Sequence, residues 1–404
     1  KAKQMVATRE WSRLMVADRL GLYVHIPFCP QRCPYCAFAV VTGRMDMTEG
    51  YVQAVCDELV WSASSPSWGN RGPFDTVFFG GGTPSRLAPK LIARILETAN
   101  RIHGIRQGAE ITLEANPTTA DAQRFGEFQD AGVNRLSIGM QSLVDETLLL
   151  LGRTHSAADA IHAYSLARQI GFRSVNCDLI FSVPAEPAAA LATTIEQLLV
   201  LEPDHISAYA LSVEKDTPFH RRRLQGDLPE VDEDDDATQF AQVRQHLTRA
   251  GFEQYEISNF SRPGHRCAHN WDCWTGGEYL GIGLSSHSFV EGERWWNLSD
   301  LDRYCQALQD GVSTRSGSEA IGPQKKREER IWLGLRTCEG VELEAGELAA
   351  MQSSTQMGIL LNSGRLTLER QRLRLVGENF AIADAVAATL IETLERDVAV
   401  AGCP

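Results

Sequence analysis

The sequence predicts an α/β protein whose first and larger part is a partial (β/α)6 barrel. Between residues 20 and 215, short β-branched or apolar runs alternate with longer segments of helical periodicity. Such alternation favours a parallel sheet with right-handed crossovers, and six repeats leave the barrel open, since a closed one has eight. The expected strands are 22–26, 76–79, 110–114, 135–138, 174–180 and 205–211, and the expected helices are 49–62, 89–103, 120–131, 145–151, 157–170 and 189–201.

Length, composition and charge narrow the class of protein. The chain has 404 residues, of which 43% are hydrophobic and 23% charged, as in ordinary globular proteins of about two or three domains. A net charge of -13 argues against a general nucleic-acid-binding surface. Because no apolar run approaches about 18 residues and no apolar signal core is evident, we expect no membrane span and a cytoplasmic location.

An acidic run at 230–236 marks the expected end of the barrel. We expect four parts, an N-terminal segment at 1–19, the barrel at 20–229, a connecting, substrate-facing segment at 230–319 and a C-terminal domain at 320–404. The connecting segment starts with a helix at 237–250. The last domain is predicted as a small α+β, winged-helix-like module, with helices at 325–335 and 343–352, a hairpin at 366–375 and a final helix at 380–396. It has no basic recognition helix, so we infer no DNA binding from it.

Three of the ten cysteines, Cys29, Cys33 and Cys36, follow the first expected strand with the spacing C-x3-C-x2-C. A structural zinc site normally needs four ligands in two pairs, and no second pair with suitable spacing follows. Thiolates also hold iron–sulfur clusters, and a 4Fe-4S cluster bound by three cysteines leaves one iron free, which can chelate the amino and carboxylate groups of S-adenosylmethionine (SAM). For the triplet alone, zinc and redox functions remain alternatives, but its position at a strand's carboxyl end favours the cluster.

The expected strands that follow also end in residues able to bind a cofactor. Glycines let the backbone approach a ligand that a β-carbon would obstruct. Carboxylates can accept hydrogen bonds from ribose hydroxyls or an ammonium group, and an arginine can pair with a carboxylate. Each such residue alone is more often structural, but together they indicate a SAM site. The candidates are Gly81, Gly82, Thr83, Glu114, Gln141, Arg153 and Asp178.

The cysteine segment 23–36, together with the strings at 79–85, 114–117, 134–142, 151–155 and 178–180, resembles radical SAM proteins over about residues 20–385. It is most similar to the branch that contains oxygen-independent coproporphyrinogen III oxidase and the HemW-type heme chaperones. The resemblance implies a 4Fe-4S cluster, SAM in contact with the candidate residues, and an electron donor such as flavodoxin or ferredoxin. It also implies reductive cleavage of SAM to a 5'-deoxyadenosyl radical. Tyr23 and Phe38 are further candidates for packing beside the cluster or the adenine.

Two positions separate the members of this branch. The oxidases carry a fourth cysteine two residues after the third, where this sequence has Phe38, and this disfavours coproporphyrinogen decarboxylation. The chaperones carry His-Asn-x-x-Tyr-Trp, proposed to bind heme; here residues 269–274 read His-Asn-Trp-Asp-Cys-Trp. Cys273 replaces the tyrosine, and Ala37 replaces an aspartate found in many chaperones.

The segment at 269–274 is a candidate heme site. Imidazole and thiolate are both axial ligands of heme iron, and on a helix His269 and Cys273 would share one face. Alternatively His269 is an internally hydrogen-bonded residue and Cys273 a small buried one.

Three functional interpretations follow. The first is a heme chaperone that binds heme and passes it to acceptor hemoproteins. The second is a radical methyltransferase that uses two SAM molecules, with Thr83 and the segment 281–288 lining a second SAM site. The third, disfavoured by Phe38, is coproporphyrinogen oxidation. Whether the protein is an enzyme is left open by the residues.

Overall fold

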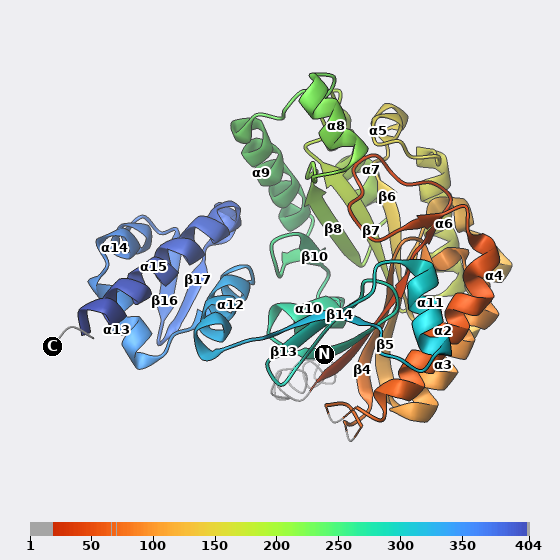
Figure 1. Ribbon diagram of the computed structural model, residues 1–404. Coiled ribbons are helices and arrows are strands. Elements are labelled where there is room, and N and C mark those ends of the chain that lie inside the picture. Colours follow the sequence, from red (N-terminus) through yellow and green to blue (C-terminus); the bar gives the residue numbers. More distant parts are fainter. Residues whose placement is uncertain (1–18, 66, 70, 402–404) are drawn as a thin grey trace, which may run out of the picture.

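The computed structural model describes residues 19–65, 67–69 and 71–401 and confirms the predicted α/β class (Figure 1). Except for Arg19, the expected N-terminal segment lies outside these residues, as does Cys403. A sheet of twelve strands forms the larger part, with the order β14-β13-β12-β11-β1-β4-β5-β6-β7-β8-β10-β9. A three-stranded sheet with its own helices forms the smaller part.

The six predicted strands form the centre of the large sheet, and neighbours pair in parallel and in chain order. They are β1 (Leu20–Ile26), β4 (Phe74–Gly81), β5 (Ile105–Ala115), β6 (Arg135–Gln141), β7 (Ser174–Phe181) and β8 (His205–Ala210). The two-residue strands β2 (Phe28–Cys29) and β3 (Val41–Thr42) pair with each other beside it. Because parallel strands end at the same edge, the loops that follow them gather at one mouth of the barrel.

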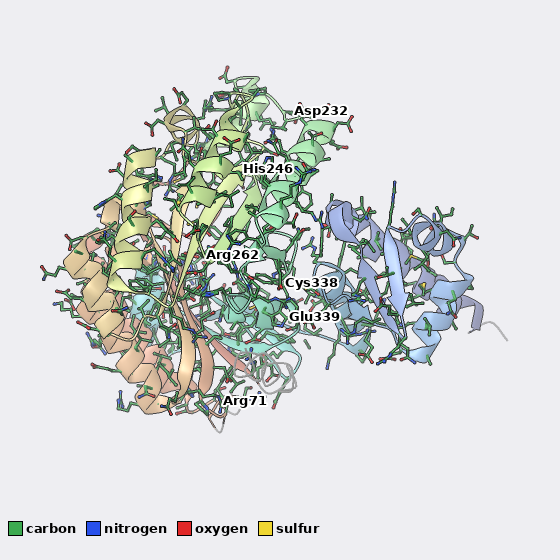
Figure 2. All side chains as sticks on the ribbon, turned by 180° about the vertical axis from the view of Figure 1, so that it is seen from behind. Arg71, Asp232, His246, Arg262, Cys338 and Glu339 are labelled. Atoms are coloured by element: carbon green, nitrogen blue, oxygen red, sulfur yellow. The ribbon has the colours of Figure 1, made fainter. Side chains whose placement is uncertain are left out.

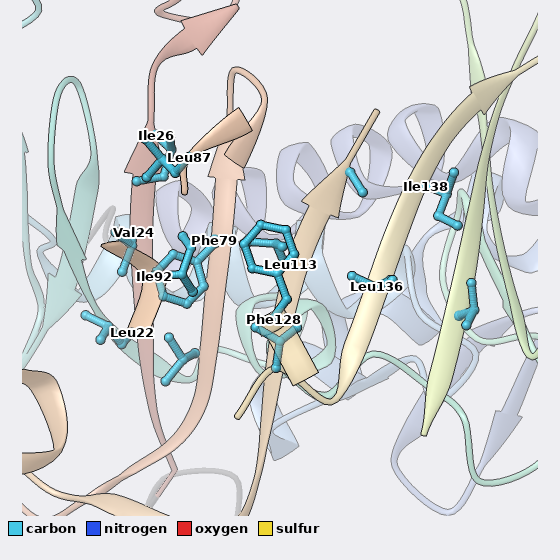
Figure 3. Packing of buried hydrophobic residues seen from close by; sticks show 14 of the residues in the cluster. Leu22, Val24, Ile26, Phe79, Leu87, Ile92, Leu113, Phe128, Leu136 and Ile138 are labelled. Atoms are coloured by element: carbon cyan, nitrogen blue, oxygen red, sulfur yellow. The ribbon is translucent and has the colours of Figure 1, made fainter. Parts of the chain in front are cut away.

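Helices cover the outer face of this sheet: α2 (Thr48–Ser62), α3 (Pro89–Ile102), α4 (Ala122–Asp130), α5 (Asp145–Leu150), α6 (Ala157–Ile170) and α7 (Ala190–Val200). The boundaries of α6 follow from its sequence, since Ser156 and Asp159 form a capping box and Gly171 ends the helix with φ 90°. Alternate strand residues such as Leu22, Val24 and Leu136 face the helices and build the core (Figure 3). The intervening residues face the barrel interior, which leaves that interior available for polar groups.

The connecting segment extends the same sheet at both edges, which the sequence did not predict. At one edge β11 (Glu278–Ile282) pairs in parallel with β1, and β12 (His287–Val290), β13 (Glu293–Asn297) and β14 (Arg315–Ala320) follow antiparallel. At the other edge β10 (Asn259–Ser261) and β9 (Glu253–Gln254) are added. The helices of this region are α8 (Pro218–Gln225), α9 (Glu233–Arg249), α10 (Ala268–Trp274) and α11 (Leu301–Gln309). The predicted boundary between 229 and 230 stays a prediction.

The acidic run has a specific structural role at the start of α9. The side chain of Asp232 accepts a hydrogen bond from the backbone N–H of Asp234, and the first turn carries four acidic residues. Negative charge at a helix N-terminus is stabilised by the helix dipole. The run therefore forms the start of α9.

The C-terminal module contains α12 (Pro323–Leu335), α13 (Ala345–Ser353), α14 (Thr355–Asn362) and α15 (Ala383–Ala401), with strands in the order β15 (Val341–Glu342), β17 (Arg372–Leu375), β16 (Leu366–Glu369). The predicted helices and hairpin are present, and α14 is additional. The module has its own buried core and meets the barrel where Cys338 N–H donates to the Tyr255 carbonyl at 2.9 Å. Figure 2 shows Cys338 and Glu339 at this junction. Within the described part of the chain, no helix is both long and apolar enough to span a bilayer.

Candidate cofactor-binding site

A cavity of about 530 Å³ opens at the carboxyl ends of the parallel strands. This volume is in the range of small-molecule sites in proteins. All the predicted cluster and SAM residues except Tyr23 line it: Cys29, Cys33, Cys36, Phe38, Gly81, Gly82, Thr83, Glu114, Gln141, Arg153 and Asp178.

The loop that carries the cysteines is held at both of its ends and in its middle. Pairing of β2 with β3 brings its two ends together. The backbone N–H of Cys36 donates to the carbonyl of Cys33 at 3.1 Å and forms a turn between these two thiols. The N–H of Phe219, at the start of α8, donates to the carbonyl of Pro34 at 2.9 Å. The three thiols are thus presented from a fastened loop at the mouth of the barrel.

The surroundings of the thiols suit a group that binds thiolates. Cys29 Sγ lies 3.4 Å from the Thr83 hydroxyl, and Arg153 Nη1 donates to Cys33 Sγ at 3.4 Å. Burial raises the pKa of the Cys29 and Cys36 thiols. Metal binding drives deprotonation of such thiols, and the arginine compensates part of the resulting charge. Among the described residues, no group of three or more His, Cys, Asp or Glu side chains is close enough to bind a single metal ion. Three soft thiolates with an adjacent cation fit an iron–sulfur cluster.

Two acidic side chains face this cavity from neighbouring parts of the sheet. Glu114 accepts a hydrogen bond from the backbone N–H of Gly81 at 3.0 Å. Asp178 accepts from the Ser137 hydroxyl at 3.2 Å and from the Asn176 amide at 2.7 Å. Burial, and next the charge of Asp178, raise the pKa of Glu114 to about 8, and burial also raises the pKa of Asp178. A cationic ligand would relieve this electrostatic cost, which suits the ammonium and sulfonium groups of SAM.

The glycines are required by the packing of the chain itself, besides any ligand. Gly81 has φ 111°, and a β-carbon there would run into the His25 ring. A β-carbon on Gly82 would lie 2.6 Å from the Pro27 backbone. From the sequence we expected glycine here only because it lets the backbone approach a ligand. The structure adds a second reason at both positions, since a β-carbon would clash with the chain itself.

Arg153 and Gln141 also line the cavity. Gln141 ends β6 in the left-handed region with φ 67°. Arg153 Nη2 donates to the Gly139 carbonyl at 3.2 Å, and its buried Nε has no acceptor among the described residues. The guanidinium therefore retains donor capacity at the cavity, as pairing with a ligand carboxylate requires.

Two predicted features lie elsewhere than the cavity wall. The Tyr23 hydroxyl lies 3.1 Å from His25 Nδ1, and its ring stacks on Phe78 at 6.3 Å. Burial, and next the charge of Glu114, raise the pKa of Tyr23. Tyr23 therefore lies inside the barrel, close to the Glu114 carboxylate. The segment 281–288, expected at a second SAM site, does not line this cavity; there the Gly283 N–H donates to Glu58 of α2 at 2.9 Å.

His269 and Cys273 both lie on α10, at the end of the barrel opposite the cavity. His269 is 6% exposed, its Nδ1 lies 2.8 Å from the Thr76 hydroxyl, and its ring stacks on Phe78 at 5.2 Å. Burial lowers its pKa to about 4. Cys273 is exposed. The segment is helical as expected, but one side chain points into the barrel and the other is open to solvent.

Sequence reasoning missed Ser137, Tyr209 and Tyr35, which also line the cavity. Tyr209 stands near the end of the sixth strand, where the rule applied to the other strands already predicted a site residue. Ser137 is four residues before Gln141 and therefore on the same face of β6. Tyr35 has no such signal beyond its place between the cysteines.

Comparison with known proteins agrees with this geometry. Residues 23–198 match the model of the radical SAM superfamily. The heme chaperone HemW of Mycobacterium tuberculosis is 34% identical over 380 residues, covering 93% of this chain and 96% of the relative. The mitochondrial radical S-adenosyl methionine domain-containing protein 1 of Mus musculus is 36% identical, over 94% of this chain and 89% of the relative. The solved coproporphyrinogen III oxidase (HemN) of Escherichia coli, at 21% identity, superposes with a TM-score of 0.77 over 96% of this chain and shares the fold.

The fold and the site together define a radical SAM protein, a class that uses a 4Fe-4S cluster and SAM. Within this class, the chain belongs to the HemW family of heme chaperones. HemW of Escherichia coli, for example, is 39% identical over 67% of this chain.

Proposed function

We propose that this protein binds heme and delivers it to acceptor hemoproteins, with a 4Fe-4S cluster and SAM as resident cofactors. The observation that carries the proposal is the single cavity that gathers the three thiols with Glu114, Arg153 and Asp178, in a chain related over most of its length to heme chaperones. Phe38, 67% exposed at this cavity, stands where the oxidases carry a fourth cysteine, so the proposal does not include coproporphyrinogen decarboxylation.

Each side chain has an assigned task in the proposal. Cys29, Cys33 and Cys36 hold the cluster, which when bound supplies the electron for reductive chemistry on SAM. Glu114 accepts hydrogen bonds from the amino group of SAM and Arg153 pairs with its carboxylate, since charge-assisted hydrogen bonds are short and strong. Asp178 accepts the ribose hydroxyls.

The remaining candidates shape the pocket. The backbone of Gly81 and Gly82 borders SAM, with Thr83 beside Cys29 and Gln141 also lining the pocket. Phe38 packs beside the adenine or the cluster, and Tyr23 supports the wall from behind, next to Glu114. A one-electron carrier such as flavodoxin or ferredoxin is the proposed electron donor.

The proposed heme site is α10. Cys273 is exposed at the surface, but desolvation and the charge of Asp272 raise its pKa to about 12, so its thiol becomes a thiolate ligand only when iron displaces the proton. His269 becomes a ligand only when it leaves Thr76 and the barrel interior. Heme titration of the purified protein tests this site. We expect a Soret band that weakens in Cys273→Ala and is lost in the His269→Ala/Cys273→Ala variant. A band that is unchanged in the double variant would show that heme binds elsewhere.

Anaerobic reconstitution tests the cofactor half of the proposal. We expect about four irons and four sulfides per chain, and a reduced cluster whose electron paramagnetic resonance spectrum changes when SAM is added. Glu114→Ala or Asp178→Ala should weaken that response while iron content stays full. Stoichiometric zinc in place of iron under these conditions would overturn the assignment.

A further inference from the structure

A column of buried hydrogen bonds runs through the barrel from the cavity to α10. The Asn176 amide donates to Asp178 at 2.7 Å, and His205 Nδ1 lies 2.6 Å from the Asn176 amide oxygen. His205 Nε2 lies 2.7 Å from the Tyr255 hydroxyl, which accepts from the backbone N–H of Cys267 at 3.3 Å. Cys267 is the N-cap of α10. The column therefore joins the proposed SAM ligand Asp178 to the N-cap residue of the proposed heme helix.

All the donors in this column point the same way. The Asn176 oxygen can only accept, so His205 Nδ1 carries the hydrogen and Nε2 accepts from Tyr255. Burial lowers the pKa of His205 well below its usual value, which keeps the ring neutral in this arrangement. Hydrogen bonds in such a chain polarise one another, and a change at one end alters the bonds at the other.

Asn176 has more acceptors than it has hydrogens to donate. Its amide nitrogen, with two hydrogens, lies 2.7 Å from Asp178 Oδ1, 2.7 Å from the Ser137 hydroxyl and 2.9 Å from the Ser207 hydroxyl. Only two of these bonds exist at one time. A ligand that donates to Asp178 changes which pair is favoured, so Asn176 is an element with discrete alternative arrangements.

At the other end, Glu110 holds the start of α10. Its carboxylate accepts from the backbone N–H groups of Ala268 at 3.1 Å and His269 at 3.2 Å, and from the Cys267 thiol at 3.4 Å. These groups have no partner within the helix, so their stability depends on Glu110 and on Tyr255. Two turns of helix follow, and His269 and Cys273 move with them.

Unused hydrogen-bonding capacity lies beside the column. Thr112, Arg135 and Ser174 are register neighbours on β5, β6 and β7, and all three face the barrel interior. Each is buried, and Thr112 Oγ1, Arg135 Nε and Ser174 Oγ have no partner among the described residues. Because these groups are free to form hydrogen bonds, polar groups inside the barrel can exchange hydrogen-bond partners without leaving another buried group unpaired.

We propose that this column couples SAM occupancy of the cavity to the stability of α10. The inference rests on the proposed function, in which Asp178 receives the ribose of SAM and α10 holds heme. SAM bound at Asp178 determines which two hydrogen bonds the Asn176 amide donates. This change in hydrogen bonding alters the bonds of His205 and Tyr255 and, through them, the first turn of α10. The binding of one cofactor thereby regulates the site of the other.

The test is amide hydrogen exchange of α10 in the reconstituted full-length protein, with and without saturating SAM. Allosteric coupling between sites is typically 5-fold or more, so we expect SAM to slow exchange of the Ala268 and His269 amides by about fivefold or more. Tyr255→Phe keeps the ring and removes the hydroxyl that links His205 to Cys267. In this variant SAM still binds, and the α10 response is lost.

Tyr164→Phe is the matched control, because Tyr164 is also buried and its hydroxyl donates to the Glu202 carbonyl at 3.2 Å, outside the column. The control keeps the wild-type response. Coupling is reciprocal, so a second variant tests it in the other direction. Glu110→Gln weakens the cap of α10 and shifts SAM affinity in the wild-type background, but not in the Tyr255→Phe background.

The possible outcomes distinguish a failure of this inference from a failure of the proposed function. If a protein with a full cluster binds no SAM, the proposed function fails and the coupling fails with it. If SAM binds while α10 exchange stays constant, only the coupling is wrong. An equal response in wild type and Tyr255→Phe would show that the column is not the route.

Discussion

Glu114 combines a buried carboxyl with a pKa that lies inside the working pH range. Burial and the charge of Asp178 raise this pKa to about 8 in the free protein. Sequence reasoning placed Glu114 at a strand end but could not predict this shift. The shift depends on how closely the strands bring Asp178 and how completely the barrel excludes water.

The affinity for SAM should therefore rise with pH up to about 8 and level off above it. Below the pKa, Glu114 is protonated, and accepting hydrogen bonds from the SAM amino group as a carboxylate requires release of that proton, which costs up to about 1.4 kcal/mol per pH unit. Isothermal titration between pH 6 and 8.5, in buffers of different ionisation heat, measures both affinity and proton release. Glu114→Gln should bind more weakly and without this slope. A flat wild-type profile would contradict the assignment.

The three cysteines of the loop differ in role from the buried ones. Replacing Cys29, Cys33 or Cys36 with alanine leaves two ligands, so we expect stable cluster binding to be lost. Cys305 is buried in α11 and does not line the cavity, so Cys305→Ala should keep the full iron and sulfide content. Chemical analysis of iron and sulfide after anaerobic reconstitution checks both. Equal iron in Cys33→Ala and wild type would remove Cys33 from the ligand set.

At the scale of elements, α2 is joined to the added edge strands by one buried carboxylate. Glu58 accepts hydrogen bonds from Gly283 N–H at 2.9 Å, Asn297 at 2.6 Å, Tyr304 at 2.5 Å and Thr314 at 2.8 Å. The donors come from four separate positions of the connecting segment. This cluster holds β11 to β14 and α11 against the helical layer.

Removing this acceptor should destabilise the whole barrel. In Glu58→Gln at least one buried donor loses its acceptor, at a cost of about 1–3 kcal/mol. Denaturant unfolding should show a lower midpoint than the wild type. Glu97 is exposed on α3, and Glu97→Gln should leave the midpoint unchanged. A midpoint that is the same for both variants would mean that the cluster is not needed to hold the edge strands.

The elements also show where sequence patterns succeed. The strands and helices of the βα repeats were predicted within about two residues at most ends because each has a strong period and a clear boundary residue. The strands β11 to β14 were missed because they are short and rich in Gly, Ser and Trp. The first of them, β11, pairs with β1, which lies over 250 residues earlier in the chain, so no local pattern indicates that the segment joins the barrel sheet.

At the scale of the whole molecule, the barrel and the C-terminal module meet at a buried carboxyl. Glu256 is 0% exposed, and its backbone forms an isolated antiparallel β-bridge with Thr337. Its side-chain Oε2 has no hydrogen-bond partner among the described residues. Burial raises its pKa to about 7. Burial therefore disfavours the ionised form at this junction, although the Ser258 N–H donates to Glu256 Oε1.

Stability should consequently fall as the pH rises toward and through 7. The pKa of Glu256 is higher in the folded than in the unfolded chain, so the folded state binds more protons between about pH 4.5 and 7, and that stabilisation is lost as the carboxyl ionises. The difference corresponds to about 3 kcal/mol at most. Glu256→Gln should unfold at higher denaturant concentration than wild type at pH 8, and the gap should close by pH 5. A gap independent of pH would rule out this carboxyl as its source.

The sequence by itself determined the βα order, the cysteine loop and the residues at the strand ends, because these depend on local periodicity and on spacing along the chain. Only the tertiary structure decided that Tyr23 lies behind the cavity wall and that His269 is buried while Cys273 is exposed. It also brought Asp178 and Cys267 into one hydrogen-bonded column through Asn176, His205 and Tyr255. Residues so distant in sequence meet because parallel strands place their inward-facing side chains in common layers, and no one-dimensional pattern records which layers touch.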